Sequence, residues 1–259
     1  MPWSMAQLYL MLPAFLLVLF RISGLMLAAP IFSSNAIPMQ FKVFLAVAIS
    51  LAVFPVVTPQ VAAPVTLASA VTGLMAEMAI GLMIGFGVTM VFVGLQVAGQ
   101  IVSQQAGIAL GDVFNPMFES SSTVVSELYF FVAMVIFLSV GGDHALIRAV
   151  LDSFETLPLL TGPSTESLAA LLIDWLNLSF TIAIRMGGPT MLALLLAFLT
   201  LGFVSRTVPQ LNLMTVGFPI KLAMALFIMA VTMMSLEPVL LDGIDTAMSG
   251  VRRLIGAEG

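Results

Sequence analysis

Hydrophobic residues form long uninterrupted runs along this chain, and charged residues separate these runs only rarely. Between Lys42 and Asp112 the sole ionised side chain is Glu77, so two stretches of 34 residues each, 43–76 and 78–111, carry no charge. A helix that crosses the hydrocarbon core of a bilayer needs about 20 predominantly apolar residues. The pattern therefore predicts helices that span a membrane or lie inside an equally apolar assembly.

The hydrophobic residues fall into six clusters, each long enough, or nearly so, for a spanning helix of about 17–25 residues. The clusters lie at about 5–30, 41–57, 67–106, 127–151, 168–204 and 213–241. Some clusters are long enough for a helical hairpin. We therefore expect an all-α membrane protein with about six hydrophobic segments.

Proline and glycine predict where these helices end or bend, because proline lacks a backbone donor and glycine weakens a helix. The first cluster breaks at Pro30, residues 55–64 form a connection, and residues 141–144 form a tight turn. Gly-Gly-Pro at 187–189 predicts a kinked interruption of the fifth cluster. Gly-Phe-Pro at 217–219 predicts an interruption of the last one.

Composition narrows the class of protein. Hydrophobic residues make up 61% of the chain and charged residues 8%, whereas a soluble domain has about a quarter of its residues charged. The net charge of −5 is spread thinly with no basic stripe, so we expect no nucleic-acid partner. The start of the chain lacks a basic region and a small-residue cleavage site, which favours mature chain over a signal peptide. The adjacent pair Arg252-Arg253 favours a cytoplasmic C-terminus.

Three arginines lie inside or beside apolar runs, where a charge is costly unless it is paired or in contact with water. They are Arg21, Arg185 and Arg206. A simple lipid-exposed bundle of six helices fits them poorly. We expect their polar contacts to come from other subunits, so that the chain alone would be unstable.

The third cluster carries two patterns that predict helix contacts. Gly81 and Gly85 have the spacing that lets two helix backbones approach closely, although this motif is common by chance in apolar sequence. Gln96, Gln100 and Gln104 share one helix face. This face either bonds to neighbouring helices or lines a hydrated pore. Both interpretations require polar groups opposite, since an unpaired buried amide costs several kcal/mol.

A loop follows this helix, and its composition is unusual. Gly107, Gly111, the Asn115-Pro116 pair and a run of serines predict irregular structure. An exposed loop does not need large hydrophobic side chains, yet this one contains five: Leu110, Val113, Phe114, Met117 and Phe118. On the residues alone, we expect them to cover the end of the chain's own bundle.

The sequence shows no catalytic motif. A phosphate-binding P-loop, a His-Glu-x-x-His pair and a Gly-x-Ser-x-Gly elbow are all missing, and Asp112, Asp143 and Asp174 are isolated. His144 is the single histidine and there is no cysteine, so a metal site has too few ligands. A turn or cap explains His144 better than a proton relay. We expect no enzyme activity, no cofactor and no metal.

A series of short segments, in a fixed order from about residue 20 to 241, resembles the FliR family of flagellar biosynthetic proteins. The segments are RISGL at 21–25, APIF at 29–32, AIP at 36–38 with Lys42, EMAIGLMIGF at 77–86, AGQIVSQQAG at 98–107, VFNP at 113–116, FLSVGGDH at 137–144 and VPQLNLMTVGFP at 208–219. The turn at 142–144 departs from the Asn-Gly-His that relatives often carry, which affects only the detail of that turn.

The resemblance implies a structural and gating subunit of the flagellar type III export gate. FliR-like proteins form with FliP and FliQ the channel for unfolded flagellar subunits, near FlhA and FlhB, in the bacterial inner membrane at the flagellar basal body. Their helical hairpins wind about a central channel in a hetero-oligomeric assembly. The resemblance also implies a FliP-like part at about 1–160 followed by a FliQ-like part at about 161–259.

For the loop, the resemblance implies a channel plug over about residues 106–122. Phe114 and Phe118 would be the stoppers, and Leu110, Val113 and Met117 would pack beside them against a methionine-rich constriction of partner subunits. Gly107 and Gly111 would act as hinges.

Two alternatives stay open. The injectisome counterpart, which secretes effectors into host cells, shares the fold, although the AIP and VPQ segments favour the flagellar branch. A six-helix solute transporter or channel should show an internal repeat and charged residues at mid-membrane depth. We find no convincing repeat.

Overall fold

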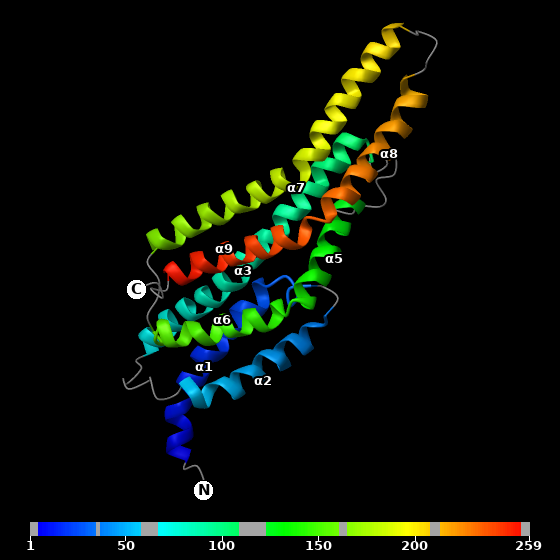
Figure 1. Cartoon of the computed structure of the whole chain (residues 1–259). Helices are drawn as coiled ribbons and strands as arrows, with labels where there is room; N and C mark the ends of the chain where they lie inside the picture. Colours follow the sequence, from blue (N-terminus) through cyan, green and yellow to red (C-terminus); the bar gives the residue numbers. More distant parts are fainter. Residues whose placement is uncertain are drawn as a thin grey trace. The chain divides into compact units, whose positions relative to one another are not determined.

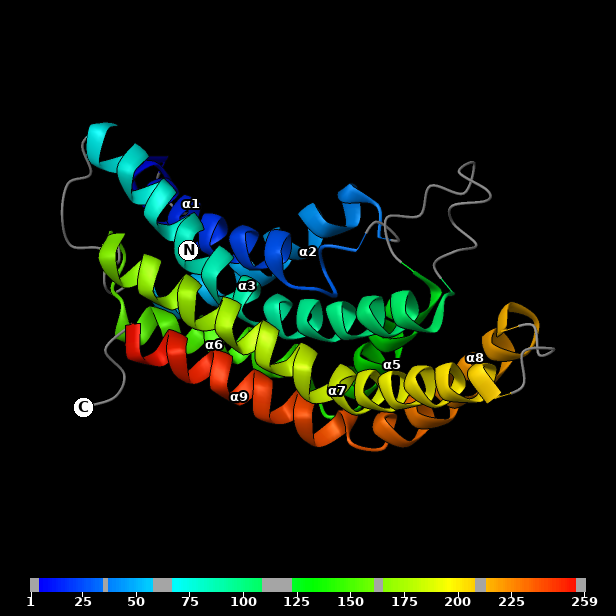
Figure 2. The same ribbon diagram turned by 90° about the horizontal axis from the view of Figure 1, so that it is seen from above.

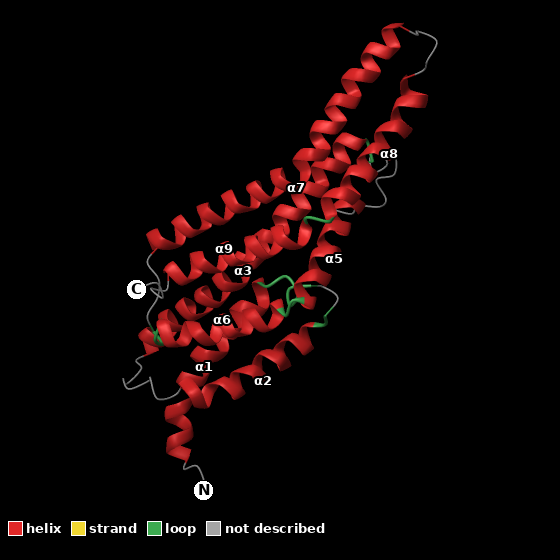
Figure 3. Ribbon diagram, in the orientation of Figure 1, coloured by secondary structure: helices red, strands yellow, loops and turns green. Residues whose placement is uncertain are grey.

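The computed structural model describes residues 5–34, 37–57, 67–108, 123–160, 165–207 and 213–254. Within these ranges it contains eight α-helices and no strand (Figure 1, Figure 3). In chain order they are α1 (Met5–Ala28), α2 (Met39–Val57), α3 (Leu67–Ala106), α5 (Val124–Ser139), α6 (Gly142–Thr156), α7 (Thr165–Thr207), α8 (Leu213–Met233) and α9 (Leu236–Leu254). The prediction of an all-helical protein is confirmed for this part of the chain.

Several helices are long and apolar enough to cross a membrane. Three qualify singly, over Met39–Val57, Val71–Ala106 and Glu166–Thr207. Two further spans form if each bent pair, α5 with α6 and α8 with α9, counts as one. A shorter apolar stretch, Leu12–Ala28, lies in α1. Each of these segments overlaps one of the six predicted hydrophobic clusters, and the last extends beyond the predicted end at 241.

Two helix ends lie where proline and glycine predicted them. Helix α1 ends at Ala28, two residues before Pro30. A turn separates α5 from α6, and Gly141 within it has φ of +74°, a left-handed conformation that glycine adopts without strain.

Neither predicted interruption ends a helix, so the break at 217–219 is wrong, while the kink at 187–189 stays a prediction. Helix α7 is continuous through Pro189, and α8 is continuous through Pro219. Proline removes one helical hydrogen bond, and helices in apolar assemblies tolerate this when neighbours satisfy the freed carbonyl. The last cluster bends instead at Met234 and Ser235. Ser235 directly precedes α9 and Pro238 lies in its first turn, a pattern that favours a helix start.

The chain divides into two compact units that do not follow the order of the sequence. Unit 1 comprises Met1–Met90, Val140–Trp175 and Ile244–Gly259, and unit 2 comprises Val91–Ser139 and Leu176–Gly243. Helices α3, α7 and α9 contribute residues to both. The boundary near residue 160 between a FliP-like and a FliQ-like part stays a prediction.

In unit 1, α1 packs against α2 and α6 (Figure 1, Figure 2). The first turns of α7 add Trp175, whose ring centroid lies 5.9 Å from that of Phe86 on α3. The Trp175 indole N–H donates to the Ala247 carbonyl oxygen of α9 at 3.4 Å. This buried tryptophan therefore joins three helices.

In unit 2, aromatic rings join α3 to α5. The ring centroid of Phe92 lies 5.6 Å from those of Phe130 and Phe137, in edge-to-face geometry. The hydroxyl groups of Tyr129 on α5 and Thr232 on α8 share a hydrogen bond of 3.3 Å. The second part of α7 lies beside α8 (Figure 1, Figure 2). These contacts connect α3 to α5 and α5 to α8.

Helices α1 and α3 approach each other so closely that only glycine fits at three positions, which we call the glycine seam: Gly24, Gly81 and Gly85. A Cβ atom on Gly81 would overlap the carbonyl oxygen of Arg21. A Cβ atom on Gly85 would lie 2.7 Å from the backbone nitrogen of Ala29, and one on Gly24 would lie 2.8 Å from a backbone nitrogen of α3. The two backbones are thus in direct contact.

We expect Gly81→Ala to lower the free energy of unfolding by about 1–3 kcal/mol, because the added methyl group must push two helix backbones apart. Gly202 on α7 is the matched control, since no described atom lies within 4 Å of a Cβ added there. Gly202→Ala should be neutral or stabilise by up to about 1 kcal/mol. Thermal unfolding in detergent measures both, and equal melting temperatures for the two variants would contradict the seam.

Candidate functional site

A fully buried arginine lies at the centre of unit 1. Arg21 of α1 forms an ion pair with Glu77 of α3, with 2.5 Å between Nε and Oε2, and both side chains are 0% exposed. Its Nη1 donates to the carbonyl oxygen of Ser153 at 2.8 Å and to the Ser153 hydroxyl at 3.1 Å. Its Nη2 donates to the Leu157 carbonyl oxygen at 3.2 Å. The guanidinium also lies 4.2 Å from the ring centroid of Phe154. Each of the three guanidinium nitrogens of Arg21 therefore has a hydrogen-bond acceptor, and an aromatic ring lies against the group.

The arginine serves as a cap for the C-terminus of α6. The last carbonyl groups of a helix have no partner within it, and a cation there is favoured by the helix dipole. Helix α6 has no basic residue in its own last turn. Arg21, which comes from α1, donates to the Leu157 carbonyl at this end, and also to that of Ser153, which accepts the Leu157 N–H as well.

Glu77 fixes the turn that follows α6. Its second carboxylate oxygen accepts a hydrogen bond from the backbone N–H of Leu160 at 3.0 Å. Leu160 has φ of +76°, and it is the one non-glycine residue with positive φ in the described chain. An L-residue in this conformation costs about 1–2 kcal/mol, which the charged acceptor helps to offset. The Arg21–Glu77 pair thus connects α1 and α3 to both sides of the α6 terminus.

The expectation that these arginines need polar contacts from other subunits is therefore wrong for Arg21 and Arg185, and the instability of the chain alone stays a prediction. Arg21 is paired as described, and Arg185 of α7 lies 2.9 Å from Asp242 of α9, with both side chains more than half exposed. Arg206 lies in the last turn of α7, where a positive charge is favourable. Sequence reasoning noted Glu77 as the sole charge between Lys42 and Asp112 but did not pair it. The sequence signal for this pair was a single acid, Glu77, and a single base, Arg21, each alone in its own apolar segment.

The two glycines predicted to pack helices, Gly81 and Gly85, lie against α1 of the same chain. Close to them, the Thr89 hydroxyl donates to the carbonyl oxygens of Ala28 and Gly85. This hydrogen bond ties the end of α1 to α3. A role of the glycines in assembly with other subunits stays a prediction.

The predicted glutamine face of α3 lies in unit 2. Gln96 and Gln100 are half-buried, and Gln104 is exposed. The Oε1 atom of Gln100 accepts a hydrogen bond of 3.4 Å from the hydroxyl of Ser126 on α5. For Gln100 this contact fits the interpretation of a bond between helices. A pore-lining role for the face stays a prediction.

The predicted plug lies outside the described residues, apart from its first hinge. Gly107 has φ of +84°, its N–H donates to the Gln104 carbonyl at 3.2 Å, and the N–H of Ile108 donates to that of Ser103 at 3.0 Å. This pair of bonds is the Schellman motif, which ends a helix. Ile108 packs on a buried cluster shared by α3, α7 and α8. Gly107 therefore caps α3, and its role as a hinge stays a prediction. The plug residues outside the described ranges are Leu110, Gly111, Val113, Phe114, Met117 and Phe118.

The single histidine lies in the first turn of α6. Its Nδ1 atom lies 3.0 Å from Oδ1 of Asp143, and the His144 side chain is 77% exposed. In the described ranges no group of three or more histidine, cysteine, aspartate or glutamate side chains is close enough to hold a metal ion. The pair is part of the turn.

Comparison with known proteins identifies the family. The family model described as "Bacterial export proteins, family 1" matches residues 12–247. The chain belongs to this family.

Three relatives of this export protein carry informative names. It is 27% identical over 250 residues to "Flagellar biosynthetic protein FliR" of Bacillus subtilis (strain 168), covering 95% of this chain and 96% of the relative. It is 29% identical over 220 residues to the protein of that name from Escherichia coli (strain K12), covering 85% and 84%. It is also 29% identical over 162 residues to "Yop proteins translocation protein T" of Yersinia pestis, covering 62% of each chain. The resemblance to the FliR family is confirmed.

We expect Glu77→Gln to destabilise the export protein by about 3–5 kcal/mol, because it leaves the buried Arg21 without a counter-charge. The double variant Arg21→Met with Glu77→Leu removes both charges and should recover only part of that loss, because the Leu157 carbonyl and the Leu160 N–H lose their partners. Arg185→Gln breaks the exposed pair and should cost no more than about 1 kcal/mol. Melting temperatures in detergent separate these cases. Equal shifts for Glu77→Gln and Arg185→Gln would show that burial of the pair is unimportant.

Proposed function

We propose that this chain is the FliR-type subunit of a flagellar type III export gate, a non-enzymatic component of the bacterial inner membrane at the flagellar basal body. With FliP-like and FliQ-like subunits it would form the channel for unfolded flagellar proteins, next to FlhA-like and FlhB-like components. The family match over residues 12–247 carries the proposal. The relatives' names, which refer to flagellar biosynthesis and Yop translocation, point to the same class of export machinery.

The exposed surface supports a subunit covered by lipid or by other proteins. Large apolar side chains are widely exposed on α2 and α7, for example Phe44 at 73%, Val56 at 75% and Phe203 at 72%. Contiguous apolar surface of this kind marks contact with a membrane or a partner. In the most apolar windows of α2 and α7 only 22% of the residues are buried within the chain, against 61% for α3. Helix α3 is thus covered mainly by the chain itself, whereas α2 and α7 present apolar faces outward.

Helix length supports an assembly in addition to lipid. Helices α3 and α7 have 40 and 43 residues, which at 1.5 Å per residue corresponds to about 60 and 65 Å. The hydrocarbon core of a bilayer is roughly 30 Å thick. Lipid alone cannot cover such helices along their whole length, which supports additional cover by the chain itself and by neighbouring subunits.

The share of each chain that aligns with its relatives favours the flagellar branch. The flagellar relatives align over most of their length and of this chain, and the Yersinia relative aligns over 62% of each. The injectisome counterpart is therefore the second candidate. The solute-transporter alternative gains no support from these relatives.

Deletion of the gene in the parent bacterium tests the proposal. Flagellar subunits should disappear from the culture medium, at least a hundredfold, while their level inside the cells stays within a few-fold of the parent. A plasmid copy should restore secretion and motility. Continued secretion of flagellar subunits, with loss of effector secretion or of solute uptake, would assign the chain to one of the two alternatives.

The plug over residues 110–118 is tested by leakage. Deletion of these residues should leave the gate assembled but raise its conductance in planar bilayers, because the hydrophobic seal is lost. Serine at Leu110, Val113, Phe114, Met117 and Phe118 keeps the loop length and should leak as well. Asn115→Ser, a polar change in the same loop, should stay tight. An assembled deletion complex as tight as the parent would show that the loop only covers the end of the bundle.

A further inference from the structure

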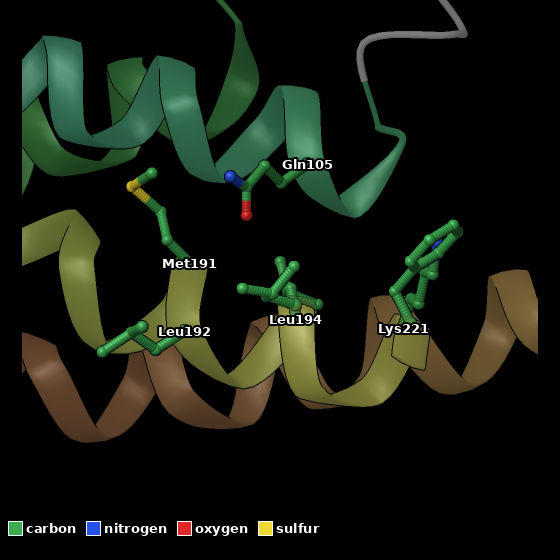
Figure 4. Close-up of a pocket in the computed structure, with 7 residues that line it drawn as sticks. Gln105, Met191, Leu192, Leu194 and Lys221 are labelled. Atoms are coloured by element: carbon green, nitrogen blue, oxygen red, sulfur yellow. The ribbon is translucent and has the colours of Figure 1, made fainter. Parts of the chain in front are cut away.

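Unit 2 contains a pocket whose chemistry the proposed gating role does not use. It has a volume of about 320 Å³ and lies where α3, α7 and α8 meet (Figure 4). Five apolar side chains of α7 line it, among them Met191, Leu192 and Leu194. Two polar side chains complete it, Gln105 from the end of α3 and Lys221 from α8. In Figure 4 the Gln105 amide points from α3 toward α7.

Lys221 carries the only charge on α8, and it is half-buried. Its Nζ atom lies 4.6 Å from the centroid of the Phe198 ring, a cation–π contact. No carboxylate among the described residues lies within ion-pair distance of it. An aromatic face attracts a cation but does not neutralise its charge. The pocket is thus apolar, positively charged and open to a further group.

The surroundings of Lys221 decide which anion can reach it. Helix α7 carries no charge over residues 186–205, and Lys221 is the only charge over residues 213–236. Phe198, which Lys221 contacts, lies eight residues before Arg206, or about 12 Å along the helix. If this hairpin crosses a bilayer, the ammonium lies well inside the uncharged stretch, away from lipid phosphates. A carboxylate on an apolar helix of another protein can lie at this depth, where a lipid phosphate cannot.

We propose that this pocket seats an aspartate or glutamate side chain on an apolar helix of a neighbouring membrane subunit. The carboxylate pairs with Lys221 and accepts a hydrogen bond from the Gln105 amide. Apolar side chains one turn away on the same helix pack against Met191 and Leu192. Charged groups inside membrane assemblies pair in this way because an isolated charge there is unfavourable. The inference rests on the proposed function, which supplies such subunits.

The test is co-purification of the full chain, tagged, with the FliP-like and FliQ-like subunits of the same bacterium. Lys221→Glu and Lys221→Gln should lower the yield of co-purified subunits at least tenfold. Lys221→Arg keeps the charge and should stay within about twofold of the parent. Arg185→Gln removes a cation elsewhere in unit 2 and should leave assembly unchanged. The melting temperature of each isolated variant separates lost assembly from lost folding.

The partner carboxylate is found by charge reversal. Each aspartate and glutamate within the apolar segments of the two partner subunits is replaced by lysine in the Lys221→Glu background. One of these replacements should restore assembly, which a purely structural role of Lys221 would not allow. Failure of every replacement to restore it would overturn the pairing.

Other occupants give different results. Assembly of Lys221→Glu at the parental yield would overturn the pocket proposal and leave the proposed function intact. If that variant instead loses an anionic phospholipid in native mass spectrometry, the pocket binds a lipid phosphate. If it loses only the capture of a second, differently tagged copy, the occupant is another copy of this chain. A parental chain that captures neither partner subunit would overturn the proposed function itself, and the pocket proposal with it.

Discussion

The direct contact between the backbones of α1 and α3 is the constraint on which the rest of unit 1 depends. Gly81 has no side chain where the carbonyl oxygen of Arg21 lies against it. The residue positioned by this contact is the same one that carries the buried charge. Because the seam fixes its backbone, the Arg21 guanidinium reaches Glu77 and the end of α6 together. Packing and electrostatics are therefore coupled through a single residue.

The hydrophobic segments could be predicted from the sequence, because tens of consecutive residues without a charge are rare outside membranes and apolar assemblies. The helix ends near Pro30 and Gly141 were also predictable from local chemistry. The bend at Met234 and Ser235 was missed because neither residue is glycine or proline, whereas Pro219 suggested a break that α8 does not have. Local signals describe single helices well. They do not show where a neighbouring helix replaces a hydrogen bond that a proline removes.

The site was predictable only in part. Arg21 and Glu77 are 56 positions apart, and no local pattern shows that two helices bring them together. The same holds for Arg185 and Asp242. Both arginines thus find a carboxylate within the chain, whereas Lys221 contacts an aromatic ring and no carboxylate among the described residues. The apolar faces of α2 and α7, in contrast, stay exposed. The chain thus pairs Arg21 and Arg185 internally and leaves hydrophobic surface for others to cover.

The separation of Arg21 and Glu77 also sets an order of events during synthesis. The arginine leaves the ribosome 56 residues before the glutamate that neutralises it, and at about 5–20 residues per second this interval is roughly 3–11 s. An arginine at the centre of a membrane helix without a partner costs about 2.5–3.5 kcal/mol on insertion scales. If α1 enters the membrane, it is a poor membrane segment until α3 arrives, and the Ser153 and Leu157 carbonyls follow later still. The first hydrophobic segment of this protein would then become stable in the membrane only as part of a group of helices.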